Sequence, residues 1–223
     1  MSISCRLWFA VRFGLEVRVV ETLARFVADL ANASIGETTN HYSRRQAGLD
    51  RPNAPGIRTE NLLGYLEARS DASLVLVGEA AGYRGCRFSG IPFTSERSLP
   101  VGRWTSTRAQ GWREPSATIV HRVLHELGLE EKTLLWNAVP THPAGSRPLS
   151  NRTPTRAELA LGICWLERLL SLTEARSVVA VGRAAASVLP SGTPVVRHPA
   201  NGGAALFRRQ LADLVMRNGQ AER

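Results

Sequence analysis

The sequence predicts an α/β protein: a three-layer αβα sandwich with a central, mainly parallel four-stranded sheet. Short apolar runs of strand length alternate with amphipathic stretches along most of the chain. The run Leu74 to Gly78 is continuously apolar and ends in glycine, as in a buried parallel strand. Strands that alternate with helices form a parallel sheet covered on both faces.

The N-terminal part of the chain predicts a helix, a loop and a second helix. Apolar residues recur every three or four positions over Glu16–Asn32, which predicts an amphipathic helix. Ala33–Arg58 is polar and holds three glycines and two prolines, so we expect a long loop over the surface or across a site. A short helix over Asn61–Arg69 leads into the first strand.

The rest of the chain repeats a helix followed by a strand. Pro115 suits the first turn of a helix, so we expect a helix over Glu114–Leu127. Pro92–Pro115 has no predicted helix or strand. The remaining elements are strand Thr133–Ala138, helix Thr155–Leu172, strand Ser177–Val181, helix Arg183–Leu189, strand Pro194–Arg197 and a helix from Gly203 to Met216.

Length and composition predict one compact domain. Its 223 residues divide into a helix-and-loop arm over residues 1–70, packed on the core, and an α/β core over residues 71–223. No apolar run approaches the ~20 residues that cross a bilayer, and Leu7–Val11 is too short for a signal peptide. We therefore expect a cytoplasmic protein, bacterial and nucleoid-associated at most, with no membrane partner.

The net charge of +9 favours a polyanionic partner. All 28 basic residues except Lys132 are arginine, which is partly a coding effect, so their position carries more information than their number. Four arginines lie in Arg97–Arg113 and five more between Ala175 and Ala212, including Arg176, and neither stretch holds an acid. The three cysteines show no C-x-x-C spacing, so we expect no disulfide framework, metal site or cofactor.

The residues that follow the strands are the candidate site, because ligands bind beyond the carboxyl ends of parallel strands. Taken singly, each has an ordinary explanation: a turn for Gly78 and Gly82, a solvated carboxylate for Glu79, a loop position for His198. Polar groups nevertheless converge there from three segments, which are Gly78–Thr94, Asn137–Pro140 and His198–Gly203.

Six short motifs in this order resemble the uracil-DNA glycosylase superfamily. They are Gly78-Glu-Ala-x-Gly82, Gly90-x-Pro-Phe93, Asn137, Ser150-Asn-Arg-x-Pro154 with Glu158, Val181-Gly-Arg183 and His198-Pro199. The resemblance runs from about Leu74 to Phe207. It implies a monofunctional enzyme that flips uracil out of DNA and hydrolyses the N-glycosidic bond, leaving an abasic site and free uracil. It also implies base excision repair, and we expect a monomer.

The resemblance also implies roles for individual residues. Backbone groups of the loop with Gly78, Ala80 and Gly82 bind the uracil edge, and Phe93 stacks on the flipped base. Asn137 reads uracil, and His198 hydrogen-bonds uracil O2.

These residue types fit the chemistry. Bond cleavage leaves an oxocarbenium-like sugar and a uracil anion, which needs hydrogen-bond donors. A neutral His198 supplies one, and the Asn137 amide can donate to O4 while accepting from N3–H.

Three departures from the family pattern bear on the site. Ala80 and Gly82 stand where the best-known branch has a water-activating aspartate and a tyrosine that blocks the thymine methyl. Glu79 then becomes the water-positioning residue, and Tyr83 crowds C5 from another direction. A thermophilic branch binds an iron–sulfur cluster, but two cluster positions here are Thr141 and Gly162, so we expect no cluster.

The third departure concerns DNA contacts. In the best-known branch a leucine in this stretch inserts into the DNA duplex, and here Gly202 and Gly203 take its place. Either the side chain of Asn201 or Arg208 inserts instead, or the enzyme prefers single-stranded DNA. Arg152 and Arg183 complete the expected DNA-binding set.

Two other hypotheses stay open. One is a protein that stays bound to uracil or abasic sites, covalently through a histidine such as His142. The other is a small α/β enzyme acting on a phosphorylated metabolite.

Overall fold

The computed structural model describes residues 21–147 and 149–221. Its core is one four-stranded sheet in which all pairings are parallel, in the order β2-β1-β3-β4. The strands are β1 (Leu74–Ala80), β2 (Thr133–Val139), β3 (Ser177–Val181) and β4 (Val195–Val196). The predicted α/β class and parallel sheet are therefore confirmed.

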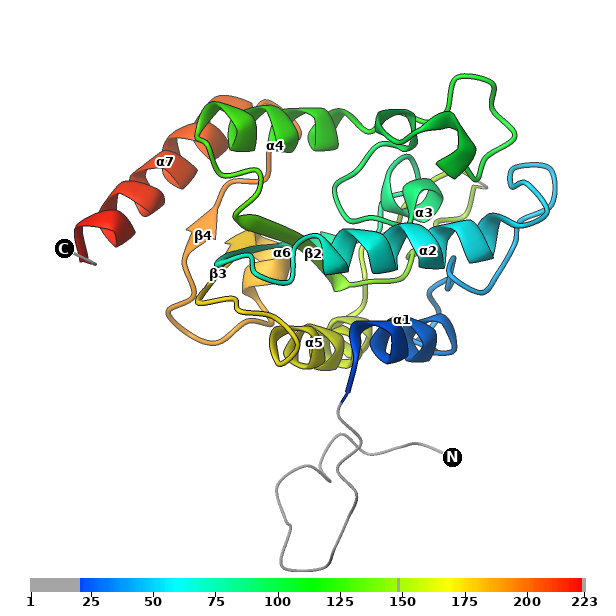
Figure 1. The fold of residues 1–223 in the computed structure, drawn as a ribbon, viewed down its shortest axis with the longest axis horizontal. Coiled ribbons are helices and arrows are strands. Elements are labelled where there is room, and N and C mark those ends of the chain that lie inside the picture. The colour runs from blue at the N-terminus through cyan, green and yellow to red at the C-terminus, as the bar shows by residue number, and fades with distance from the viewer. Residues whose placement is uncertain (1–20, 148, 222–223) are drawn as a thin grey trace, which may run out of the picture.

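Helices cover both faces of this sheet (Figure 1). Alternate residues of β1 point to opposite faces, so Val75 and Val77 join one buried cluster and Leu74 and Leu76 join another. The first cluster contains residues of α1 (Leu23–Ala31), α2 (Ala54–Glu67), α5 (Arg156–Leu170) and α6 (Arg183–Ala186). The second contains residues of α4 (Pro115–Glu126) and α7 (Ala204–Ala221).

The N-terminal helices belong to the first cluster. Phe26 and Leu30 of α1 and Leu62 and Leu66 of α2 are fully buried beside the strands. The hydroxyl of Thr22 caps α1 by accepting from the backbone N–H of Arg25 at 3.2 Å. The predicted start of this helix, Glu16 to Val20, lies outside the described residues, and the division at residue 70 stays a prediction.

The prediction for the start of α2 is wrong. The expected loop to Arg58 and helix from Asn61 are replaced by a helix that begins at Ala54. Pro55 lies in its first turn, where a backbone N–H has no partner within the helix, so proline starts this helix instead of breaking it.

The other boundaries differ modestly. β4 has only two residues, α6 ends at Ala186, and α7 continues past Met216 to Ala221.

Short helical turns appear where regular structure was not predicted. The helix α3 (Cys86–Ser89) follows β1, and two 3₁₀ turns, η1 (Glu96–Ser98) and η2 (Val101–Arg103), follow it. The buried carboxylate of Glu96 accepts from the backbone N–H groups of Thr105, Ser106 and Trp112 at 2.6, 2.7 and 3.0 Å. One carboxylate thus organises a segment that has no regular hydrogen-bond pattern.

Candidate active site

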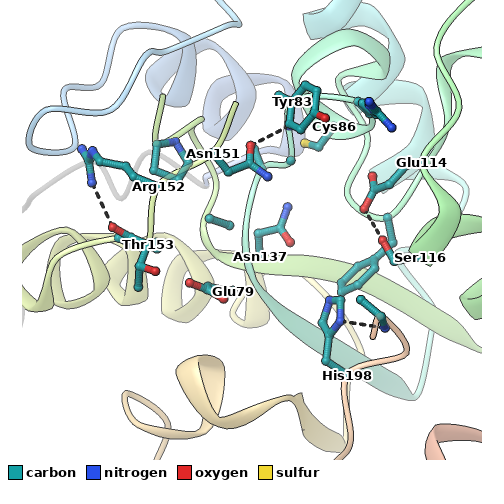
Figure 2. Close-up of a pocket in the computed structure, with 18 of the residues that line it drawn as sticks. Glu79, Tyr83, Cys86, Glu114, Ser116, Asn137, Asn151, Arg152, Thr153 and His198 are labelled. Carbon is teal, nitrogen blue, oxygen red and sulfur yellow. Dashed lines mark hydrogen bonds between the residues drawn. The ribbon is translucent and has the colours of Figure 1, made fainter. Parts of the chain in front are cut away.

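A cavity of about 480 Å³ opens at the carboxyl ends of the strands (Figure 2). Eight residues from the predicted set line it: Glu79, Ala80, Gly82, Tyr83, Phe93, Asn137, Arg152 and His198. They come from the end of β1, the loops after it, β2, the loop after β2 and the loop after β4. The predicted convergence of separate segments on one edge of the sheet is therefore present.

Asn137 lies near the middle of this cavity (Figure 2). It is only 3% exposed and pairs in register with Gly78 of β1. Among the described residues its side-chain amide has no hydrogen-bond partner. Because the residue lines the cavity and its amide has no partner within the described residues, the amide is available to hydrogen-bond a ligand there.

Phe93 forms part of the cavity wall next to Gly78. A β-carbon on Gly78 would lie 2.3 Å from Cζ of Phe93, so only glycine allows the ring to approach the strand this closely. Phe93 has φ of 51°, a left-handed conformation that is rare for a bulky residue. Such strain is typical of residues whose placement serves a site.

His198 lies two residues beyond β4, with its ring 6.3 Å from that of Phe93 between centroids. The backbone N–H of Ala200 donates to its Nδ1 at 3.1 Å, so Nδ1 is an acceptor and the proton of the neutral ring is on Nε2. Burial, together with nearby Arg197, lowers the pKa of His198. The ring is therefore a neutral donor at neutral pH.

The loop holding His198 requires a glycine at position 203. A β-carbon there would lie 2.1 Å from the carbonyl oxygen of His198. Gly203 therefore allows the chain to turn back close to the backbone of His198. It is not one of the residues that line the cavity.

Glu79 provides one carboxyl group to the cavity. It is half-buried at the end of β1, and burial raises its pKa. Figure 2 shows it on the opposite side of Asn137 from Glu114.

Glu114 provides a second carboxyl group, which the sequence analysis did not place in the site. Its Oε1 accepts from the hydroxyl of Ser116 at 2.6 Å, and burial raises its pKa. The loop after β1 passes so close that a β-carbon on Gly85 would lie 1.5 Å from Glu114 Oε2, while one on Gly82 would lie 3.7 Å from Oε1. Only a fold that packs α4 beside this loop brings Glu114 here.

Asn151 joins two loops at the cavity rim. Its side-chain oxygen accepts from the backbone N–H of Tyr83 at 3.0 Å. The next residue, Arg152, lines the cavity but binds Glu158 through two hydrogen bonds of 2.7 and 2.6 Å. Glu158 also forms the capping box of α5 with Thr155. Arg152 is thus held in place by the first turn of α5.

The other predicted DNA-binding residues lie outside the cavity lining. Asn201 and Gly202 are exposed at a turn where both have positive φ, 52° and 76°. Arg183 is exposed at the start of α6, and Arg208 pairs with Glu126 of α4 at 2.8 Å. Their contact with DNA stays a prediction.

The arginines of the two basic stretches lie in different parts of the fold. Arg103 pairs with Glu60, and the guanidinium of Arg108 lies 4.7 Å above the ring of Trp112. Arg176 precedes β3, at the amino ends of the strands, and so faces away from the cavity. Arg176 is therefore not part of the cavity surroundings.

The residues at the expected cluster positions do not fit an iron–sulfur cluster. The hydroxyl of Thr141 hydrogen-bonds that of Thr38 at 2.5 Å, and a β-carbon on Gly162 would lie 2.0 Å from the carbonyl oxygen of Ala138. Burial raises the pKa of the Cys86 thiol to about 12, which disfavours a metal-binding thiolate. Within residues 21–147 and 149–221, no three histidine, cysteine or acidic side chains are grouped to hold a metal ion.

The fold and the cavity define an α/β enzyme whose active site lies at the carboxyl edge of a parallel sheet. Residues 65–215 match the family model of the uracil DNA glycosylase superfamily, which is more than half of the chain. The chain belongs to that superfamily, and is thus a DNA glycosylase, a hydrolase of base excision repair.

The comparison with solved structures supports the fold. Wild-type SMUG2 of Pedobacter heparinus aligns with 89% of this chain and 99% of its own, with a TM-score of 0.60 and 14% identity. A search of curated proteins found no significant match. In the part of the chain that the structure describes, no helix has the length and apolar character needed to cross a membrane.

Proposed function

We propose that this protein is a monofunctional uracil-DNA glycosylase, which hydrolyses the bond between uracil N1 and deoxyribose C1′. The observation that carries the proposal is the side-chain amide of Asn137, which has no hydrogen-bond partner among the described residues. It lies in the cavity near Phe93, with Glu79 and Glu114 on opposite sides of it. This amide suits the Watson–Crick edge of a flipped pyrimidine.

Asn137 selects uracil over cytosine. Its NH₂ group donates to O4 and its oxygen accepts from N3–H. Cytosine has a donor at C4 and an acceptor at N3, so both contacts would fail, at about 1–3 kcal/mol for each unpaired group. Extruding the base costs a few kcal/mol, of which stacking on Phe93 returns about 1–3 kcal/mol.

His198 stabilises the leaving group. As the C1′–N1 bond breaks, its electron pair stays on uracil and negative charge develops on the oxygens. The Nε2–H of a neutral imidazole, fixed by the bond from Ala200 to Nδ1, donates to O2. The donor is oriented before the reaction, so no reorganisation is needed as charge develops.

Glu79 positions the attacking water. Its carboxylate at the end of β1 can accept a hydrogen bond from a water near C1′, whose oxygen bonds to the oxocarbenium carbon while its proton passes to the carboxylate. The raised pKa of Glu79 makes it a better proton acceptor than an exposed glutamate. Glu114, whose Oε1 accepts from the Ser116 hydroxyl, bounds the opposite wall.

The test is excision of uracil from a labelled oligonucleotide, single-stranded or paired with A or G, followed by alkali. We expect strand cleavage only after alkali, with free uracil released. The Asn137→Asp protein, purified in parallel, controls for a contaminating glycosylase. Absence of alkali-labile sites in every substrate would overturn the proposal, and cleavage without alkali would contradict a monofunctional enzyme.

The covalent alternative has no support from the geometry of His142. This side chain is 3% exposed, its Nδ1 lies 2.9 Å from the carbonyl oxygen of Ala81, and it does not line the cavity. A denaturing gel after reaction should show no shifted protein–DNA band.

A further inference from the structure

A second hollow, of about 430 Å³, lies beside the first and carries only positive formal charge. Its lining includes four arginines and no acidic residue: Arg44, Arg45, Arg87 and Arg147, with His142 and small or polar neighbours. Three of the four arginines, all but Arg87, are exposed. None of these four belongs to the DNA-binding set expected from the sequence.

The two hollows share a wall. Cys86 and Pro143 line the first cavity, and the next residues in sequence, Arg87 and Ala144, line the second. Backbone hydrogen bonds between Thr39 and His142, of 2.8 and 3.0 Å, join the two segments that form the second hollow. A ligand that leaves the first cavity across Pro143 therefore enters the second.

A buried ion cluster holds the loop that displays Arg44 and Arg45. Asp50 accepts from Arg58 and from Arg87, at 2.7 Å in each case, and from the backbone N–H of Gln46 at 2.8 Å. Burial opposes ionisation of Asp50, but the hydrogen bonds from Arg87 and Arg58 outweigh it and lower its pKa. The loop is thus fixed to the core through its charges.

The cluster also places a guanidinium at the floor of the hollow. Arg87, only 3% exposed, lines it and donates to Gln46 Oε1 at 3.0 Å. A buried guanidinium beside three exposed ones is a preformed environment for phosphate oxygens. Because arginine binds phosphate without sequence preference, the hollow suits a nucleic-acid backbone.

We propose that the second hollow binds backbone phosphates of the DNA strand that carries the target base, next to the flipped nucleotide. The inference rests on the proposed function for the identity of that base, but the phosphate contacts need no excision. Arg44 and Arg147 act as the outer phosphate contacts, one from each side of the hollow.

The test compares the double variant Arg44→Gln/Arg147→Gln with wild type for binding to a fluorescein-labelled single strand that lacks uracil. Fluorescence anisotropy is measured from 50 to 300 mM salt. Two lost phosphate contacts should reduce the slope of log K against log salt by about 1.4 and weaken binding about tenfold or more at 50 mM. Arg176→Gln, which removes an exposed arginine at the opposite edge of the sheet, controls for net charge.

Thermal unfolding of both variants checks that the fold is intact, and pyrophosphate is titrated as a small-anion probe. An unchanged slope in the double variant, or an equal loss in Arg176→Gln, would overturn the inference. So would a variant that loses pyrophosphate binding but keeps the wild-type salt slope for DNA. One further outcome is that the wild-type protein excises no uracil while the double variant still shows the expected smaller salt slope. In that outcome the proposed function fails and the phosphate site stands.

Discussion

Gly78 and Phe93 are packed so that a β-carbon on the glycine would lie 2.3 Å from Cζ of the ring. Because Phe93 is already held at φ of 51°, the ring has little freedom to withdraw without moving its backbone.

Gly78→Ala should therefore displace the ring from its place in the cavity wall. A misplacement of about 1 Å can reduce activity on the order of 100-fold. Steady-state excision kinetics measure this, and Gly102→Ala is the control, because nothing lies within 4 Å of a β-carbon there. Equal activities for the two variants would contradict the role of this contact.

The roles of Asn137, His198 and Glu79 can be ranked by substitution. If stabilisation of the uracil anion supplies most of the rate, Asn137→Asp and His198→Ala should each lower kcat about 100- to 1,000-fold. Glu79→Ala should have a smaller effect. Single-turnover kinetics with excess enzyme measure the chemical step, and a larger loss for Glu79→Ala would reverse the ranking.

The protonation of His198 can be measured directly. Nitrogen-15 NMR should show a neutral ring with the proton on Nε2, and a pKa below the ordinary value of 6.5. Since the pKa is lowered, the donor stays neutral as the pH falls through 6.5 and becomes charged only at lower pH. A ring that titrates above 6.5, or carries its proton on Nδ1, would contradict the mechanism.

The separation between Gly82 and the Glu114 carboxyl group should determine tolerance of 5-substituted uracils. The nearest atoms to a β-carbon at this position belong to the Glu114 carboxyl group, at 3.7 to 3.8 Å. We expect wild type to accept 5-hydroxymethyluracil and Gly82→Phe to lose this substrate more than uracil. Competition between the two bases in one oligonucleotide measures the ratio, and complete refusal by wild type would exclude an open C5 side.

Glu158 should stabilise the fold in a pH-dependent way. The hydrogen bonds from Arg152 lower its pKa from 4.5 to about 2. Because this pKa is below that of the unfolded chain, the stabilisation is present above pH 4.5 and is lost as the pH falls toward 2.

Glu158→Gln should cost about 2 kcal/mol at pH 7, as expected for hydrogen bonds to a charged group, and less in acid. Urea unfolding at pH 7 and pH 3 measures this, with the exposed Glu131→Gln as control. If the loss in free energy of unfolding is the same at both pH values, Glu158 stabilises the fold through packing and not through its charge.

The sequence predicts the sheet and half of the site because both depend on local patterns. Continuous apolar runs such as Leu74–Val77 identify buried strands, and the topology of a parallel sheet then brings Glu79, Asn137 and His198 to one edge. A proline such as Pro55 is compatible with the first turn of a helix or with a loop. The local sequence does not distinguish the two, because the outcome depends on tertiary packing.

Glu114 shows why the rest of the site is not predictable from local pattern. In the sequence it is a helix-flanking glutamate, and its place in the cavity depends on the distance between α4 and the loop at Gly85. The Asp50 cluster is similar, because it joins residues 50, 58 and 87 through contacts that no periodicity encodes.

The short length of β4 has a consequence for solubility. β4 ends the sheet on one side, and an edge strand presents unpaired backbone groups that can recruit a second chain. With two residues, and proline at position 194 just before it, β4 offers too little backbone for such growth into aggregates. Because β4 ends at Val196, His198 follows only two residues later and lies at the carboxyl ends of the strands, beside the cavity.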